Sequence, residues 1–422
     1  MKKTLKVLVA AVMLIVCVSG VFAQGSAESD KLIIWDKSEY VGAYNELAKA
    51  RFEEFCAENG IEGEYVIVPP NDLRQRLYAA IEGGNPPDIV VTDDFSAKQY
   101  AGMGQLADVG DIKTSLPFIQ AGLDISLCEN GDYVVPLAIL APGLYLRADK
   151  WAEAGLDYPT TWEELREDAR IINDPENDFY ALGYPMGTSG GGDAEGMCRA
   201  VILAFGGVPV DAEGNVTVNS PETLEALKYI ASLYEEGLCP PSAITWDDMG
   251  NNTAYLAGSV GIVQNSGSLY SQIKEENPEL YANTVILPWM EGPAGLYTPT
   301  GGNCFIVFEK GGSVDMAKKY ITEFFDMDFY KNLVISMGGM WQPVIEGAAD
   351  DPFWEEPENA GWLANSLGGV PNTYPAPVND ATNRAFTEQL CVRAVQKIVL
   401  QDMDPQQALD ELEADFIRVL GQ

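Results

Sequence analysis

The chain has 422 residues, with 63 acidic against 26 basic side chains and no histidine, so its formal charge at pH 7 is −37. The missing histidine excludes Ser-His-Asp triads and histidine-ligated zinc. The acidity argues against binding to nucleic acid or to an anionic lipid surface, because both depend on basic residues. A chain of this length exceeds what one hydrophobic core usually serves, so we expect two domains.

The first 23 residues have the pattern of an export signal. Three lysines precede a short apolar run, Leu8–Val18, and Val21-Phe22-Ala23 places small residues at the −3 and −1 positions of a signal-peptidase site. This predicts a signal peptide over residues 1–23, cleaved before Gln24. The alternative is a lipoprotein anchored through Cys17. Both alternatives export the protein, and cleavage would remove three lysines and no acid, which takes the charge from −37 to −40.

The chain then alternates strands and helices. The expected elements are a strand over Lys31–Asp36, a helix over Gly42–Asn59, a strand over Glu64–Val68, a helix ending at Ile81 and a strand over Asp88–Thr92. This βαβαβ order predicts a mainly parallel sheet with helices on its faces. Ligands of such sheets bind beyond the carboxyl ends of the strands, which is where Trp35, Glu39 and Asp94 are expected.

The most specific stretch is Ala141–Leu165. Tyr145 lies in a short strand, Gly155 is placed to end a helix in the left-handed conformation, and Thr161 with Glu164 predicts a capping box. By these local signals alone, the stretch is predicted to form a strand, a helix, a turn and a second helix.

As a string, this stretch resembles family 1 of the extracellular solute-binding proteins, the sugar-binding proteins of ABC importers, at the point where they pass from their first lobe to their second. The residues that carry the resemblance are Gly143, Tyr145, Asp149, Ala154-Gly155 and Pro159–Glu164. The stretches AAIEGGNPPDIVVTDD and SPETLEALKYIASLYEEGLCPP resemble the same family.

The resemblance implies an α/β, two-lobe periplasmic-binding-protein fold, with mainly parallel sheets flanked by helices and a hinge of three crossings. The first lobe would comprise residues 31–142 with 301–338, and the second residues 143–300 with 339–422. Hinges are expected near Pro142–Leu144, Pro299–Gly301 and Gly338–Met340, where a Gly or Pro break coincides with the implied change of lobe.

Sugars are bound by aromatic rings and by acids or amides that form paired hydrogen bonds. The candidate ligand-binding residues are Trp35, Glu39, Asp94, Tyr145, Trp246, Tyr270, Gly302, Asn303 and Trp341. Core packing remains the alternative for each aromatic, a helix cap for Asp94, and a turn for the glycine. The sharpest expectation is that Trp35 and Trp341 stack on a sugar from the two sides of a cleft and are partly exposed without it.

A secreted carbohydrate-active enzyme, a glycoside hydrolase or lyase, would use the same residue types. Its clearest acid pair, Asp93 and Asp94, cannot flank one glycosidic bond, because adjacent strand residues point to opposite faces. The six cysteines that follow the signal are scattered, without metal-like or redox-like spacing. We therefore predict a monomeric binding protein with no catalytic residue, metal or cofactor, which delivers a small carbohydrate to an ABC transporter permease in the membrane and binds no nucleic acid.

Overall fold

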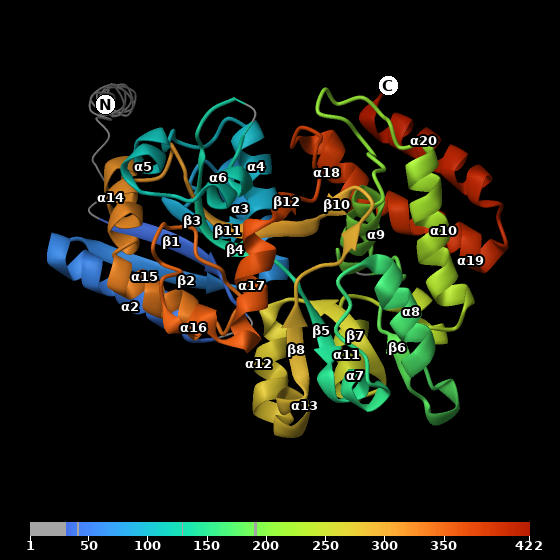
Figure 1. Cartoon of the computed structure of the whole chain (residues 1–422). Helices are drawn as coiled ribbons and strands as arrows, with labels where there is room; N and C mark the ends of the chain where they lie inside the picture. Colours follow the sequence, from blue (N-terminus) through green and yellow to red (C-terminus); the bar gives the residue numbers. More distant parts are fainter. Residues whose placement is uncertain (1–30, 40–41, 129, 190–191) are drawn as a thin grey trace, which may run out of the picture.

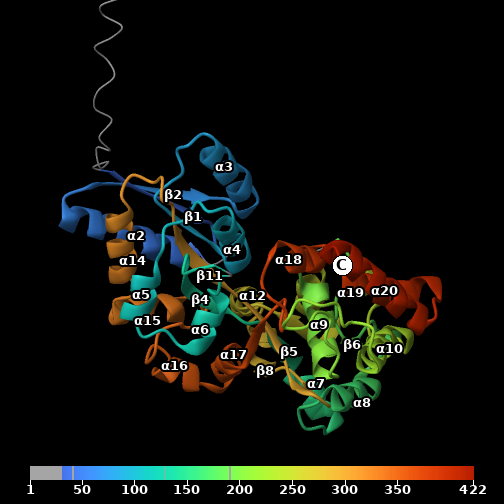
Figure 2. The same cartoon turned by 90° about the horizontal axis from the view of Figure 1, so that it is seen from above.

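The computed structural model describes residues 31–39, 42–128, 130–189 and 192–422, so the predicted signal peptide and Cys17 lie outside the described residues. The described chain forms two α/β lobes that lie side by side (Figure 1) and are joined by several connecting segments, which are also visible from above (Figure 2). The two-lobe α/β fold is therefore confirmed.

The sheet of the first lobe has six strands. They are β1 (Lys31–Lys37), β2 (Glu62–Val68), β3 (Ile89–Asp93), β4 (Val134–Leu140), β11 (Thr298–Val307) and β12 (Gly369–Pro371). β1 pairs in parallel with both β2 and β3, as the βαβαβ pattern predicts, whereas β11 runs antiparallel to β3 and β4.

Helices cover both faces of this sheet. They are α2 (Gly42–Asn59), α3 (Pro70–Glu82), α4 (Asp94–Gly102), α5 (Gly110–Ser115), α6 (Gln120–Ile125), α14 (Val314–Phe324), α15 (Met327–Ser336) and α16 (Pro352–Glu355). Along β1 the side chains alternate, so Leu32, Ile34 and Asp36 are buried towards α2 and α14, while Trp35 packs on the opposite side, where α3 and α4 lie.

The second lobe has a four-stranded sheet in the order β6 (Tyr180–Leu182), β7 (Val260–Asn265), β5 (Gly143–Arg147) and β8 (Thr284–Leu287). Only β6 and β7 are parallel, since β5 runs antiparallel to both of its neighbours. The expectation of a mainly parallel sheet therefore does not hold in this lobe. A small hairpin, β9 (Glu291–Gly292) and β10 (Gly295–Leu296), leads from β8 to β11.

The helices of the second lobe are α7 (Ala148–Ala154), α8 (Trp162–Ile172), α9 (Asp193–Ala204), α10 (Pro221–Glu235), α11 (Gly250–Leu256), α12 (Gly267–Glu276), α13 (Pro278–Ala282), α17 (Pro357–Leu367), α18 (Asp380–Thr387), α19 (Leu390–Gln401) and α20 (Pro405–Leu420). The predicted capping box of α8 is present, with Thr161 accepting from the Glu164 N–H, and Gly155 ends α7 at φ +69°. None of the helices in the described part of the chain is long and apolar enough to span a bilayer.

Strand pairing locates two of the crossings between the lobes. Leu140 pairs with Gly301 in the first sheet and Gly143 pairs with Asn265 in the second, so the chain crosses at Ala141-Pro142. It returns through β11, whose first residues pair with β12 and whose later residues pair with β4.

The predicted third crossing at Gly338–Met340 is wrong. After this turn, Gln342 exchanges backbone hydrogen bonds with Ile139, and Ile345 bridges Phe118, so the chain stays on the first lobe. It crosses only between Ile345 and α17, which packs on β8. Gly338 and Gly339 have φ of +57° and +85°, so the glycine pair forms a local turn instead of a change of lobe.

A buried ion pair joins separate parts of the second lobe. Arg199 Nε donates to Glu195 Oε1 at 2.8 Å, and the glutamate is 0% exposed. Its carboxylate also accepts the N–H groups of Cys391 and Val392 at the start of α19, while Arg199 Nη1 donates to the Asn372 carbonyl. The pair therefore fixes α9 against α19 and the segment before α18.

Arg199→Met should strongly destabilise the protein, because it leaves the Glu195 charge buried without its partner. We expect a loss of about 3–5 kcal/mol in the free energy of unfolding, measured by urea titration. The matched control is Arg170→Met, which removes an exposed pair with Glu236 and should cost at most about 1 kcal/mol. Similar losses in the two variants would contradict the structural role of the buried pair.

Candidate functional site

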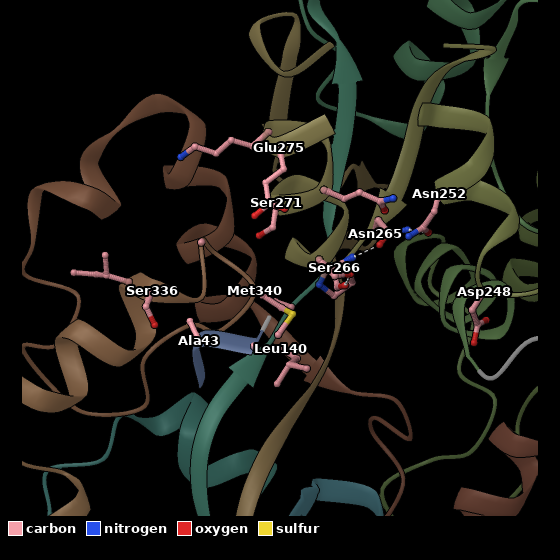
Figure 3. Close-up of a pocket in the computed structure, with 18 of the residues that line it drawn as sticks. Ala43, Leu140, Asp248, Asn252, Asn265, Ser266, Ser271, Glu275, Ser336 and Met340 are labelled. Carbon is pink, nitrogen blue, oxygen red and sulfur yellow. Dashed lines mark hydrogen bonds between the residues drawn. The ribbon is translucent and has the colours of Figure 1, made fainter. Parts of the chain in front are cut away.

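Two large cavities lie between the lobes. The larger measures about 1020 Å³ and the other about 730 Å³. The larger cavity is lined from the first lobe by Ala43, Leu140 and Met340, among others, and from the second by Asp193, Asp248, Asn252, Asn265 and Ser266 (Figure 3). The other cavity lies between α4 and the beginning of α18. Both therefore have walls from both lobes.

Two acids stand at the start of α9 on the wall of the larger cavity. Asp248 Oδ1 accepts the N–H groups of Gly192 and Asp193, each at 3.3 Å, so it caps this helix. Asp193 Oδ2 in turn accepts from Asn251 Nδ2 at 3.0 Å. Burial, together with the nearby Asp248 charge, raises the pKa of Asp193 to about 7. The carboxylates are thus held in place by the protein before any ligand is present.

Two asparagines continue this wall, Asn252 from α11 and Asn265 from the end of β7. Asn265 Nδ2 donates to Asn252 Oδ1, and Asn265 Oδ1 accepts the N–H of Ser266 at 2.9 Å. Figure 3 shows both carboxamides at the cavity. Each asparagine is at least nine-tenths buried, and the Asn252 Nδ2 group has no hydrogen-bond partner among the described residues. It remains available to an acceptor in the cavity.

The first lobe carries a second polar cluster, whose predicted site residues line neither of the two cavities. Glu39 Oε1 accepts from Asn303 Nδ2 at 3.0 Å and is 3.2 Å from Lys37 Nζ. Asp94, the first residue of α4, lies close by. Its Oδ1 accepts the N–H of Gly302 in β11 at 3.1 Å, and its Oδ2 accepts from Lys98 at 3.0 Å. Four predicted site residues, Glu39, Asp94, Gly302 and Asn303, therefore form one connected group.

A fully buried acid, Asp36, lies behind this polar cluster and is connected to it by hydrogen bonds. Asp36 Oδ2 accepts from the Tyr65 hydroxyl and, at 3.3 Å, from Asn45 Nδ2. Asn45 Oδ1 accepts the N–H of Glu39 at 2.9 Å, so this side chain links the acid to the loop that carries the glutamate. Burial raises the pKa of Asp36 to about 7, although the hydrogen bond from Tyr65 opposes that shift. The ends of β1 and β11 are thus joined through a buried carboxyl.

The aromatic residues that the sequence predicted for the site do not line the cavities. Tyr145 is 0% exposed and its hydroxyl bonds the Ser266 carbonyl and the Tyr270 N–H. Tyr270 is 4% exposed and packs on Trp362, and Trp246 donates its indole N–H to Ser242. None of the nine predicted residues lines either of the two cavities.

Trp341 is 0% exposed, and its ring centroid lies 4.3 Å from that of Tyr44 in the core of the first lobe. The expectation that it is partly exposed without ligand is therefore wrong. The backbone pairing of Gln342 with Ile139 draws the segment into the core, although its glycine-rich sequence suggested an open hinge. Trp35 is half-buried on the side of α3 and α4, and its stacking on a sugar stays a prediction.

The sequence reasoning missed the polar wall of the second lobe. Its members are Asp193, Asp248, Asn252 and Asn265. The sequence carried a signal for Asn265, because this polar residue ends the buried strand β7 in the same way as Asp93 ends β3. The other three lie at the starts of helices, where an acid or amide is more often a cap.

The candidate site contains no metal cluster among the residues that the structure describes. The six cysteines in that part of the chain are free thiols, and only Cys128 is more than slightly exposed. The second-lobe wall of the larger cavity therefore offers hydrogen-bond acceptors and donors.

Residues 36–330 match the family described as bacterial extracellular solute-binding protein. The chain belongs to this family. Its members deliver solutes to ABC importers and are not enzymes, so this solute-binding protein is extracytoplasmic and the enzyme alternative has no support.

Relatives match over most of the chain. A Brucella suis protein named only as a binding protein is 25% identical over 396 residues, which cover 92% of this chain and 93% of the relative. YcjN of Escherichia coli, named as an ABC transporter periplasmic-binding protein, is 25% identical over 334 residues, 76% of this chain and 74% of the relative. The maltotriose-binding protein of Pyrococcus abyssi is 24% identical over 332 residues, 77% and 68% of the two chains.

Solved structures share the fold at lower identity. The maltose-bound MalE3 of T. maritima has a TM-score of 0.74 at 21% identity, covering 92% of this chain and 99% of its own. The cyclic alpha-maltosyl-1,6-maltose binding protein of Arthrobacter globiformis has a TM-score of 0.77 at 20% identity, covering 92% and 98%. The two-lobe architecture of the solute-binding protein is thus matched over nearly its whole described length.

Trp341→Ala should destabilise the solute-binding protein without ligand, because the whole indole is buried against Tyr44. We expect a loss of about 3–5 kcal/mol in the free energy of unfolding, measured by denaturant titration. Tyr158→Ala, at an aromatic that is 44% exposed, serves as the control and should change little. A normal stability of the Trp341 variant would show that the ring is not a core residue.

Asp36→Asn should change how stability depends on pH. The pKa of Asp36 rises from its ordinary value of 3.8 to about 7 on folding, so the folded state takes up a proton between these values. The stability due to this carboxyl is therefore largest below about pH 4 and is lost as the pH rises to about 7. The difference in unfolding free energy, wild type minus variant, should fall by up to about 1.4 kcal/mol per pH unit in this window.

Urea titrations at four pH values between 4.5 and 7.5 measure this difference. The groups that face Asp36, namely Tyr44, Tyr65, Lys37 and Glu39, are the same in both proteins, and Asp193 titrates in both. The difference in unfolding free energy between the two proteins therefore reports the titration of Asp36 alone. A difference that does not vary with pH would contradict the prediction.

Proposed function

We propose that the protein captures a carbohydrate between its two lobes and delivers it, as a monomer, to the permease subunits of an ABC importer. The observation that carries this proposal is the polar cleft with walls from both lobes, in which carboxylates and carboxamides face a cavity of about 1020 Å³. We also propose that the protein acts in the periplasmic or extracytoplasmic space, either free after cleavage of its signal peptide or anchored through Cys17.

The chemistry of the walls supports a sugar. Hydroxyl groups donate well to carboxylates, and a carboxylate can accept from two neighbouring hydroxyls. Asp193 and Asp248 line the larger cavity and offer such acceptors from the second lobe. Asn252 adds a donor. Several relatives and fold neighbours are named for sugars, among them maltotriose and maltose, which agrees with this chemistry.

A binding screen tests the proposed function. Purified protein is titrated calorimetrically with a panel of mono- and oligosaccharides, and each mixture is then analysed for products. We expect saturable binding of at least one sugar without turnover, unaffected by chelator or reductant. Turnover, or failure of every sugar to bind while a solute of another class binds, would overturn the proposal.

Removal of a carboxylate from the second-lobe wall should weaken binding of that sugar. Asp193→Asn and Asp248→Asn should each raise Kd about ten- to a hundredfold, because a hydrogen bond to a charged acceptor contributes about 1.5–3 kcal/mol. The control is Asp157→Asn, which makes the same chemical change at an exposed acid outside both cavities. Normal affinity in both cleft variants would place the ligand elsewhere.

A further inference from the structure

A small cavity lies inside the second lobe, apart from the cleft. It measures about 10 Å³ and is bounded by α9, the segment that follows β12, α18 and the Phe416 ring of α20. A volume of this size holds about one water-sized molecule. An occupant is therefore a single small molecule or ion, and the polar atoms around the cavity decide which one.

Two buried polar side chains that line this cavity each have an atom without a partner. Arg199 Nη2 and Thr373 Oγ1 are closed to solvent and form no hydrogen bond with any residue that the structure describes. Both residues are 6% exposed. Leaving such groups unpaired costs free energy, so native proteins nearly always satisfy them. The cavity that both residues line is the place where a partner can be supplied.

The rest of the Arg199 guanidinium already has partners. Its Nε donates to Glu195 Oε1 at 2.8 Å, and its Nη1 donates to the Asn372 carbonyl at 3.2 Å. The ring centroids of Phe386 and Phe416 lie 5.3 and 5.6 Å from the guanidinium carbon, so apolar surface surrounds the charge. The group that is left over is Nη2, which can only donate, so the occupant must accept a hydrogen bond.

The charges around the cavity favour a neutral occupant over an anion. Glu195 is 0% exposed and balances the charge of Arg199, so an anion would be buried beside a pair without net charge. The whole chain is also strongly acidic, with a formal charge of −37. A water molecule needs no balancing charge. It can accept from Arg199 Nη2 and donate to the Thr373 hydroxyl at the same time.

The cavity lies where the chain returns from the sheet of the first lobe. Asn372 and Thr373 directly follow β12, which pairs with β11 in that sheet. The backbone of α9 also comes close to both strands, since a Cβ at Gly196 would lie 4.0 Å from Asn372 Oδ1 and from Pro299 Cγ. A bridge from Arg199 to Thr373 therefore acts on the connection between β12 and α18.

We propose that one buried water molecule bridges Arg199 Nη2 and the Thr373 hydroxyl, and that it completes a clamp which holds the connection between β12 and α18 on α9. The direct bond from Arg199 to Asn372 is the other half of this clamp. The clamp concerns the framework of the second lobe, so it is independent of which solute the cleft takes.

Thr373→Val tests the bridge by the sign of its effect on stability. Valine keeps the shape of threonine and removes the hydroxyl, so a bridging water loses a partner. We expect the equilibrium constant for unfolding, measured by urea titration, to rise about five- to tenfold. Without a bridging water the same substitution removes an unpaired buried hydroxyl, and stability would stay equal or increase.

Thr298→Val is the matched control. The Thr298 hydroxyl is also fully buried and without a partner in the described part of the chain, but it lines none of the three cavities described above. Its replacement should leave the unfolding constant unchanged or lower it. Opposite signs at Thr373 and Thr298 would therefore separate a bridged hydroxyl from an unpaired one.

A crystal structure of the wild-type protein, with some crystals soaked in sodium bromide, identifies the occupant. We expect a density peak at about 2.7–3.2 Å from both Arg199 Nη2 and Thr373 Oγ1, without anomalous signal from bromide. A bromide signal at this position would overturn the inference by making the cavity an anion site. The lack of any peak would overturn it as well.

Amide hydrogen exchange measures the clamp itself. The N–H groups of Tyr374 and Ala376 bond the carbonyls of Pro371 and Thr373 within the connection. Both should exchange about three- to tenfold faster in Thr373→Val than in wild type, while exchange in α7, which does not border the cavity, should be unchanged. Unchanged exchange in the connection, or a Thr373 variant as stable as wild type, would overturn the clamp. Neither result would affect the proposed capture of a solute, which is tested by the binding screen.

Discussion

An apolar cluster that crosses from one lobe to the other constrains the rest of the molecule. Trp341 packs on Tyr44 in the first lobe, and Trp362 packs on Tyr145 and Tyr270 in the second. Backbones also meet here, since a Cβ at Gly267 would lie 2.4 Å from the Met340 nitrogen. Separation of the lobes at this side would expose several large aromatic side chains, at roughly 25 cal/mol for each Å². Relative motion is therefore expected to pivot about this cluster and to change the width of the cleft.

The polar walls of the cleft depend on buried groups behind them. Asp36 in the first lobe and Asp193 in the second both have a pKa raised to about 7, in each case chiefly by burial. Both are tied to a neighbouring asparagine, Asn45 and Asn251 respectively. Burial of a carboxyl opposes folding above its ordinary pKa, so these acids reduce stability at neutral pH. At the same time they orient the loop of Glu39 and the first turn of α9, and Asp193 in that turn lines the larger cavity.

The sequence predicted most of the local structure because local signals determine it. The capping box at Thr161, the left-handed Gly155 and the parallel pairing of β1 with β2 and β3 all follow from patterns within a few residues or one βαβ unit. The failures concern long-range packing. Trp341 follows two glycines, which suggested an open hinge, but its burial depends on Ile139, about two hundred positions earlier. The antiparallel β5 and the polar wall around Asp193 likewise depend on which distant strands and helices meet.

Most polar side chains of the cleft walls already form hydrogen bonds within the protein. Asp248 and Asn379 cap helices, and Asn265 is bonded to Asn252. Their positions are thus fixed before a ligand arrives, which reduces the conformational entropy lost on binding. What they retain is the unused lone pairs of the carboxylate oxygens and the remaining amide hydrogens. A ligand whose groups both donate and accept can use all of these at once, and the hydroxyl is the simplest group that does so.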